Sequence, residues 1–193
     1  MPTLKKNPAI NCGSSMQNIK LHDKTFGLLI NHSDIQFRVQ SIAEEINQEY
    51  VNRVPLFLGV LNGSFLFAAD LFKSLLIDCE ISFIKVSSYS GTSSTGLVKS
   101  LVGLSVDIFN RDIIIIEDIV DTGDTMKYLL EELNTNKPSS IKIATMIFKP
   151  TALKHDIKPD YVGFELPPDF IVGYGLDYNG LGRNLNDIYT LIY

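Results

Sequence analysis

The sequence predicts an α/β fold, a doubly wound and mainly parallel β-sheet flanked by helices. Apolar runs typical of buried strands alternate along the chain with segments in which apolar residues recur at helical spacing, the pattern of strand–helix–strand units. The clearest run is residues 113–116, where four consecutive isoleucines indicate a strand that is buried on both faces and therefore central in the sheet. A length of 193 residues fits one domain with a sizeable core.

The first helix is predicted to begin at Ser33 and to end near Tyr50. Ser33 and Gln36 match a capping box, in which each side chain satisfies a backbone N–H group that the helix leaves free. Residues 1–17 are polar, contain two prolines and show no periodicity. We therefore expect a loose extension before a domain of residues 18–193. The apolar residues at helical spacing are Ile35, Val39, Ile42 and Ile46.

The remaining elements follow the same alternation. A short apolar run bounded by proline and glycine predicts a strand over 55–60, and the turn 62–64 leads into a helix over 65–76. The small, hydroxyl-rich segment 87–96 predicts a flexible loop at the tip of a hairpin. Further strands are predicted over 81–86, 112–117, 141–148, 161–164, 171–172 and 188–191, and a further helix over 125–133.

Composition excludes several classes of protein. The chain has 17 basic and 22 acidic residues, so its net charge of −5 creates no broad field to attract nucleic acid or an anionic membrane. Two cysteines, Cys12 and Cys79, are too few for a disulfide framework or a four-cysteine zinc site. No apolar run approaches the roughly 20 residues of a membrane helix, and no signal peptide is recognisable. We therefore expect a cytoplasmic protein without nucleic-acid or membrane partners.

Residues 113–125, with the sequence IIIIEDIVDTGDT, form the motif that carries chemistry. The loop 121–125 places backbone N–H groups and two hydroxyls at a helix N-terminus and at the carboxyl end of a central strand, which favours phosphate binding. Gly123 lets a ligand approach the backbone closely. Four acids within eight residues repel each other and a phosphate, and a shared Mg²⁺ would relieve that repulsion, although each acid alone is equally compatible with a capping or strand-end role. These acids are Glu117, Asp118, Asp121 and Asp124.

A strand that ends in Glu-Asp also occurs in P-loop nucleotide hydrolases. That interpretation requires an upstream Gly-Lys pair followed by serine or threonine, which this chain lacks. The segment 113–125 instead resembles the phosphoribosyl-pyrophosphate signature of the type I phosphoribosyltransferases. Four further segments narrow the resemblance to the hypoxanthine-guanine members of the family: 60–71, 87–96, the Lys149-Pro150 pair and 159–185.

The resemblance covers about residues 18–193. It implies the family's fold, with a small irregular hood formed by the terminal segments. It also implies the transfer of a phosphoribosyl group from 5-phosphoribosyl-1-pyrophosphate to hypoxanthine or guanine, which gives IMP or GMP and pyrophosphate. The implied cofactor is Mg²⁺, and the implied assembly is a homodimer or homotetramer.

The resemblance further implies roles for single residues around the sugar. Asp121 would lie beside N7 of the purine and act as the general base. Glu117 and Asp118 would face the ribose hydroxyls, directly or through Mg²⁺. The 5′-phosphate would be cradled by Asp121 together with Thr122, Gly123, Asp124 and Thr125.

At the purine, Lys149 would donate to the 6-oxo group, Phe170 would stack on the ring, and the backbone of Ile171 would reach its edge. From position alone, Lys149 is also compatible with a solvated lysine at a strand end, and Phe170 with an ordinary core residue. The pyrophosphate side would comprise Asp177 as a Mg²⁺ ligand, Arg183 as a clamp, the Asn62-Gly63 loop with a cis Leu61–Asn62 peptide, and a mobile lid that contains Ser88 and Tyr89.

Two positions depart from the family pattern. Asn62 stands where some members carry lysine or arginine, and Asp124 adds a negative charge inside the phosphate loop. Two alternatives stay open from the sequence. One is a regulatory protein on the same fold that senses the sugar pyrophosphate or a nucleotide without turnover. The other is a relative that prefers xanthine.

Overall fold

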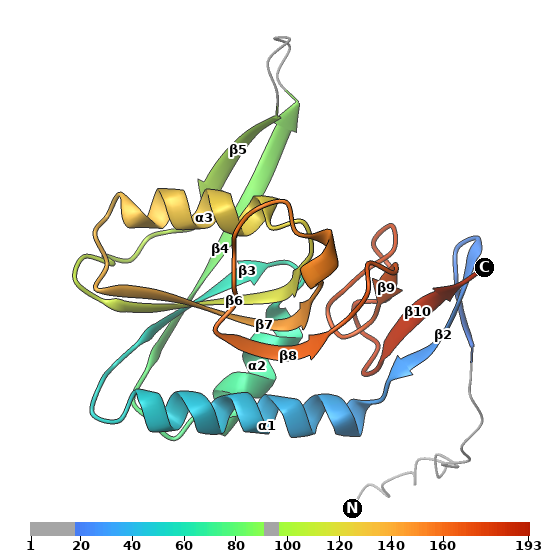
Figure 1. Ribbon diagram of the computed structural model, residues 1–193, viewed down its shortest axis with the longest axis horizontal. Coiled ribbons are helices and arrows are strands. Elements are labelled where there is room, and N and C mark those ends of the chain that lie inside the picture. Colours follow the sequence, from blue (N-terminus) through green and yellow to red (C-terminus); the bar gives the residue numbers. More distant parts are fainter. Residues whose placement is uncertain (1–17, 91–96) are drawn as a thin grey trace, which may run out of the picture.

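The larger sheet of the protein has six strands, all parallel except for one edge strand. The computed structural model describes residues 18–90 and 97–193. The strand order is β5-β4-β3-β6-β7-β8, and the β4–β5 pair is antiparallel (Figure 1). The predicted mainly parallel sheet is therefore confirmed. Its strands are β3 (Leu56–Leu61), β4 (Glu80–Ser90), β5 (Leu97–Val102), β6 (Asp112–Val120), β7 (Ser140–Phe148) and β8 (Tyr161–Glu165).

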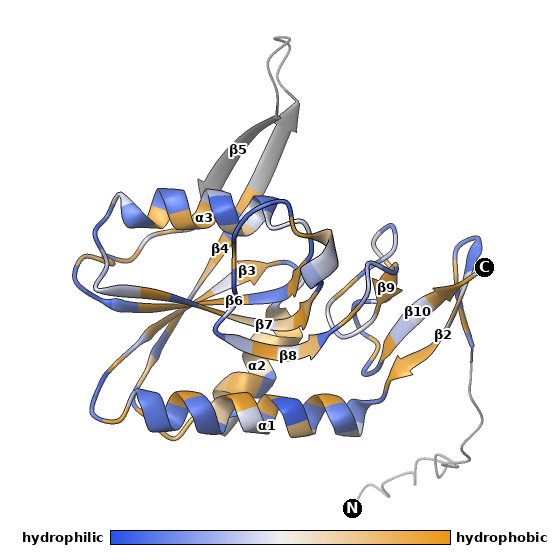
Figure 2. Ribbon diagram, viewed as in Figure 1, coloured by the Kyte–Doolittle hydropathy of each residue, from blue (hydrophilic) through white to orange (hydrophobic). Residues whose placement is uncertain are grey.

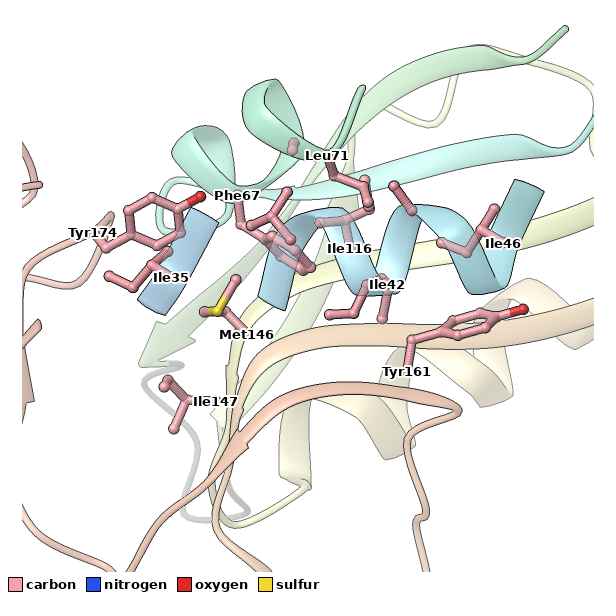
Figure 3. Close-up of a cluster of buried hydrophobic side chains, with 14 of the residues drawn as sticks. Ile35, Ile42, Ile46, Phe67, Leu71, Ile116, Met146, Ile147, Tyr161 and Tyr174 are labelled. Atoms are coloured by element: carbon pink, nitrogen blue, oxygen red, sulfur yellow. The ribbon is translucent and has the colours of Figure 1, made fainter. Parts of the chain in front are cut away.

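Helices cover both faces of this sheet. In Figure 1, α1 (His32–Glu49) and α2 (Phe65–Ser74) lie on one side of the sheet, and α3 (Asp124–Asn134) lies on the other. The isoleucines of β6 confirm the burial predicted for a central strand. Ile114 and Ile116 pack in the cluster with α1 and α2, in which Figure 3 labels Ile116, while Ile113 and Ile115 pack in the cluster with α3. In Figure 2, hydrophilic and hydrophobic residues alternate along α1 and α3, as expected for helices that cover a sheet.

The terminal segments form a second sheet, the hood. Its antiparallel strands have the order β1-β2-β10-β9 and join residues about 160 positions apart in the sequence. The hood implied by the resemblance is thus present, although it is a regular sheet whose first hairpin the sequence analysis did not predict. Its strands are β1 (Ile19–Leu21), β2 (Lys24–Ile30), β9 (Ile171–Val172) and β10 (Ile188–Ile192).

The start of α1 differs from the capping-box prediction. The N-cap is Asn31, whose side chain accepts a hydrogen bond from the Asp34 N–H, and the His32 N–H donates to Asp187 of the hood at 2.7 Å. The Gln36 side chain does not return to the helix start but donates to Asp70 of α2. The prediction of Ser33 as cap was wrong: the cap lies two residues earlier, at Asn31, and a contact with the hood satisfies the His32 N–H of the first turn.

Two strands run further than predicted. β6 continues to Val120, so Glu117 and Asp118 lie inside the strand rather than at its end. β4 continues to Ser90 and pairs with β5, which confirms the hairpin but shortens its loop. Residues 91–96 of that loop and the predicted extension 1–17 lie outside the described residues. Within the described part of the chain, no helix has the length and apolar character needed to cross a membrane.

Candidate active site

Two buried carboxylates lie side by side in β6. Glu117 and Asp118 are 9% and 8% exposed, and one oxygen of Glu117, Oε2, is buried without a hydrogen-bond partner among the described residues. Burial, followed by the adjacent Asp118 carboxylate, raises the pKa of Glu117 well above its ordinary value, and burial also raises the pKa of Asp118. A buried carboxylate oxygen without a partner is expensive, so this pair is suited to a ligand that brings hydroxyl groups or a cation.

The loop after β3 closes against this pair. A Cβ atom on Gly63 would lie 1.6 Å from Oδ2 of Asp118, so only glycine fits there. A Cβ on Gly175 would lie 2.0 Å from the carbonyl oxygen of Gly63, which brings the hood backbone onto the same loop. The Leu61–Asn62 peptide is cis, as the resemblance implied, and Asn62 is exposed beside it. The predicted pyrophosphate loop therefore lies between β6 and the hood.

The loop from β6 to α3 lines a cavity of about 220 Å³ that reaches from Glu117 to Met126. Gly123 has a left-handed φ of 81° and is the N-cap of α3, without a side-chain cap. Thr122, Gly123 and Thr125 of the predicted phosphate set line this cavity together with Asp121. The backbone of the loop thus meets the predicted requirements for an anion site at a helix N-terminus.

Asp124, the remaining member of that predicted set, does not line this cavity. Its carboxylate accepts a hydrogen bond from Oγ1 of Thr122 at 2.9 Å and lies 2.7 Å from Nε2 of His155 and 3.3 Å from Nζ of Lys154. The hydrogen bond with His155, and then that with Thr122, hold the pKa of Asp124 far below its ordinary value. Sequence reasoning missed Lys154 and His155, which no local pattern connects to a loop 30 residues earlier.

A second cavity, of about 190 Å³, adjoins the first and shares Ile119 and Asp121 with it. Lys149 is only 4% exposed, so it is not a solvated lysine, and its Nζ lies 3.0 Å from Oδ2 of Asp121. The cavity unites residues that the sequence analysis assigned separately to the ribose, the purine and the pyrophosphate. They are Asp118, Asp121, Lys149, Phe170, Ile171, Asp177 and Arg183.

One wall of the second cavity is aromatic. Phe170 is 41% exposed and is therefore not an ordinary core residue. Its ring centroid lies 5.7 Å from that of Tyr178 and 6.2 Å from that of Phe26, and the Lys24 ammonium lies 5.5 Å from it. These neighbours fix the ring while leaving part of it open to the cavity. The buried Ile171 follows in β9, where it pairs with Thr190.

Asp177 and Arg183 form an ion pair with each other at 2.5 Å. Arg183 also donates to the Gly175 carbonyl, and Asp177 accepts a hydrogen bond from the Gly180 N–H. In the described residues no group of three or more histidine, cysteine, aspartate or glutamate side chains forms a metal site. Mg²⁺ needs only one or two protein carboxylates when a substrate phosphate and water supply the other ligands, so the acids present fit a substrate-borne Mg²⁺.

The predicted lid lies on β4. Ser88 and Tyr89 pair along the backbone with Lys99 and Val98 of β5. Their side chains and the hairpin tip lie outside what the structure describes, so the lid stays a prediction.

Comparison with known proteins supplies the family. Residues 29–179 match the family model described as the phosphoribosyl transferase domain. The chain belongs to the phosphoribosyltransferase family. The hypoxanthine-guanine phosphoribosyltransferase of Bacillus subtilis strain 168 is 46% identical over 159 residues, which cover 82% of this chain and 88% of that protein. A Staphylococcus epidermidis protein of the same name is 43% identical over 172 residues, which cover 89% of this chain and 96% of the relative.

Solved structures extend the comparison to the fold. A crystal structure of a hypoxanthine-guanine phosphoribosyltransferase from Bacillus anthracis has a TM-score of 0.77 and 36% identity, and covers 86% of this chain and 96% of that one. A Trypanosoma cruzi hypoxanthine phosphoribosyl transferase has a TM-score of 0.79 and 31% identity. The match covers 90% of this chain and 95% of that one. The fold of this phosphoribosyltransferase is therefore the type I fold that the sequence predicted.

Proposed function

We infer that this phosphoribosyltransferase is a purine-salvage enzyme that joins hypoxanthine or guanine to 5-phosphoribosyl-1-pyrophosphate and releases IMP or GMP and pyrophosphate. The Asp121–Lys149 pair carries this inference. Asp121 belongs to both cavities, so it lies where a purine and a ribose phosphate meet. Lys149 places a buried ammonium in the purine cavity. The two relatives named hypoxanthine-guanine phosphoribosyltransferase, which are 46% and 43% identical to this chain, support the same activity.

The purine end selects an oxo substituent. The Lys149 ammonium has only donors to offer, so it pairs with a 6-oxo oxygen but opposes a 6-amino group. Phe170 stacks on the ring from the open side of the aromatic wall, and the Ile171 backbone meets the ring edge. These three residues line the same cavity, which supports their assignment to the base.

In the reaction, a bond forms between a purine ring nitrogen and C1 of the ribose while the bond from C1 to pyrophosphate breaks. The pyrophosphate leaves with the electron pair, and the purine loses a ring proton, which Asp121 accepts as general base. The side chain of Asp121 is 45% exposed, so it can pass that proton on to water. Its ion pair with Lys149 holds the carboxylate at the edge of the purine cavity.

Glu117 and Asp118 serve the sugar. Their acceptors suit the two ribose hydroxyls, and Oε2 of Glu117, which has no hydrogen-bond partner in the described part of the chain, provides a position for one of them. Negative charge on this pair also stabilises the positive charge that develops on the ribose as pyrophosphate departs. The 5′-phosphate occupies the backbone cradle of residues 121–125, at the N-terminus of α3.

We propose that Asp177, together with Glu117 and Asp118, is the source of Mg²⁺ ligands. When bound, Mg²⁺ would neutralise pyrophosphate charge and relieve the repulsion between these acids and the substrate. Arg183, which lines the cavity beside Asp177, would clamp the pyrophosphate with the Asn62-Gly63 loop.

Assembly and location are part of the same proposal. A homodimer or homotetramer is supported by apolar side chains left on the surface, such as Phe65 on α2 at 38% exposure and Phe83 on β4 at 40%. A cytoplasmic location is consistent with the free thiol of Cys79. Sedimentation velocity would measure the assembly, and fractionation of cells would measure the location.

The function is tested by a spectrophotometric assay with hypoxanthine, guanine, xanthine and adenine, each with Mg²⁺ and with EDTA. Hypoxanthine and guanine should react, and adenine should not, because an opposed pair of donors in a closed site costs roughly 1–3 kcal/mol. EDTA should abolish the activity and Mg²⁺ should restore it. Turnover of xanthine alone would favour the xanthine-preferring relative. Binding of IMP without turnover of any base would favour the regulatory protein.

A further inference from the structure

The phosphate loop of this chain contains two aspartates and no basic residue. Asp121 has a partner in Lys149, which belongs to the purine cavity. Asp124 begins α3, next to the place where the proposed function requires a doubly charged phosphate. An uncompensated carboxylate there would repel the phosphate that the helix N-terminus attracts.

The segment after β7 folds back onto this loop. The Lys154 N–H donates to the Thr122 carbonyl at 3.0 Å. A Cβ on Gly123 would lie 3.2 Å from Leu153 and 3.3 Å from Ile157, so the segment packs directly on the glycine of the loop. The backbone therefore holds the side chains at 154 and 155 beside the first turn of α3.

Both oxygens of Asp124 are engaged from this segment. Nε2 of His155 lies 2.7 Å from Oδ1, and the Lys154 ammonium lies 3.3 Å from Oδ2, which also accepts the Thr122 hydroxyl. The carboxylate is thereby held toward residues 154 and 155. The Lys154 ammonium contributes the positive charge, and it belongs to the same chain segment that begins with Lys149 at the purine cavity.

We propose that Lys154 and His155 are positioning residues for the 5′-phosphate: they hold the Asp124 carboxylate and offset its charge, so that the loop 121–125 accepts a phosphate although it contains an acid. The proposal rests on the proposed function, which places the phosphate in this loop. The loop then receives its compensating cation from a separate chain segment. It also predicts that the segment matters only while position 124 is acidic.

The test compares Lys154→Met with Lys154→Met/Asp124→Asn. The Lys154 side chain is 62% exposed, so its replacement leaves the fold intact. We expect Lys154→Met to raise KM for 5-phosphoribosyl-1-pyrophosphate about three- to fivefold, as loss of one nearby charge predicts. kcat should stay within about twofold of the wild-type value. The variant loses an interaction that stabilises the bound substrate and the transition state equally. Asp124→Asn in the same chain should return KM to within about twofold of wild type, because the acid that needed compensation is gone.

Lys127→Met is the matched control. Lys127 lines a third cavity, beside α3, together with Lys154 and His155. It also carries one positive charge, but it pairs with Glu131 at 4.0 Å rather than with Asp124. It should leave KM unchanged. His155→Ala, which releases Oδ1 of Asp124, should raise KM in the same direction as Lys154→Met and should likewise be rescued by Asp124→Asn. The differences should shrink at about 1 M salt, where the Debye length is about 3 Å.

Equal KM values for wild type and Lys154→Met, a rise of the same size in Lys127→Met, or a failure of Asp124→Asn to restore KM would each overturn the proposal. Calorimetric titration with IMP is run on the same proteins. If the wild-type chain shows no transferase activity, the proposed function fails. The order of IMP affinities, with Lys154→Met weakest and the double variant restored, still decides this inference separately.

Discussion

Acidic side chains at the two ends of the parallel strands in the larger sheet have pKa values that are shifted in opposite directions. These ends are the carboxyl edge and the amino edge of the sheet. At the carboxyl edge, Glu117 and Asp118 are buried side by side, and burial raises the pKa of each. At the amino edge, hydrogen bonds from Arg53 lower the pKa of Asp112, and hydrogen bonds from Lys142 and then Tyr161 lower that of Glu49. Asp112 and Glu49 form ion pairs that stabilise the fold, whereas Glu117 and Asp118 form none among the described residues.

Two buried tyrosines extend the comparison, and they lie at opposite ends of the hydrophobic cluster along α1 (Figure 3). Tyr161 donates to Glu49 at 2.5 Å near the amino edge. Tyr174, in the hood, donates to Asp70 of α2 at 2.9 Å, and Gly175 after it packs on the Gly63 carbonyl. The first bond joins elements within the domain core, and the second holds the hood against the pyrophosphate loop.

The largest expected effect is at Asp121. Asp121→Asn keeps the shape of the side chain but removes its basicity, so we expect kcat to fall roughly 10²- to 10⁴-fold while the melting temperature changes little. Steady-state kinetics and a thermal melt measure the two quantities. If the residue were only a loop cap, asparagine would serve equally well and both quantities would stay near wild type.

Asp112→Asn is the matched control at the amino edge. It weakens an ion pair with Arg53 that solvent partly screens, so we expect a loss of only about 0.2–1 kcal/mol of stability with kcat unchanged. Since the pKa of Asp112 is lowered, its contribution is present above the ordinary value of 3.8 and is lost as the pH falls below it. An activity loss in Asp112→Asn as large as in Asp121→Asn would remove the contrast between the edges.

Glu117→Gln should separate activity from stability. Loss of a charged acceptor should lower kcat/KM roughly tenfold to a hundredfold. Removal of a buried repulsion should raise the free energy of unfolding by about 0.5–2 kcal/mol. Denaturant titrations across pH check the second part. A loss of both stability and activity would show that Glu117 is structural.

The pH dependence of Glu117 has a definite sign. Burial raises its pKa above the ordinary 4.5, so the folded protein binds this proton more tightly than the unfolded chain does. Wild-type stability should therefore fall as the pH rises above about 4.5 toward the raised pKa. Glu117→Gln should show a smaller decline, because the raised pKa of Asp118 still contributes.

Small effects on stability are expected at the two tyrosines. Tyr161→Phe and Tyr174→Phe each remove one buried hydroxyl donor, and each should cost about 0.5–1.5 kcal/mol of stability. Only Tyr174→Phe should also raise KM for 5-phosphoribosyl-1-pyrophosphate, because its bond holds the hood against the pyrophosphate loop. Equal kinetics in the two variants would limit Tyr174 to a stabilising role.

Several features were predictable from the sequence because they depend on local patterns. Four isoleucines can be buried only between two layers, which places β6 at the centre of the sheet. Residues 121–125, the predicted phosphate loop, are one contiguous segment that follows this strand and leads into α3. The position of the site therefore followed from one segment together with the general rule for parallel sheets.

Tertiary structure alone decided the rest. The N-cap of α1 is Asn31 rather than Ser33, although both residue types are compatible with that role. The His32 N–H donates to Asp187 of the hood, a contact that the local sequence does not reveal. The hood pairs β2 with β10 across most of the chain length.

The distant partners of acidic side chains were likewise not predictable from the sequence pattern. His155 lies 31 positions from Asp124, and Tyr174 lies 104 positions from Asp70. The spacing of apolar residues depends only on neighbours in the sequence. The sequence by itself therefore determined the larger sheet, its helices and the position of the predicted phosphate loop. Hydrogen bonds and ion pairs between distant segments depend on how the layers dock, so only the folded structure determined which acids are satisfied and which stay open for a ligand.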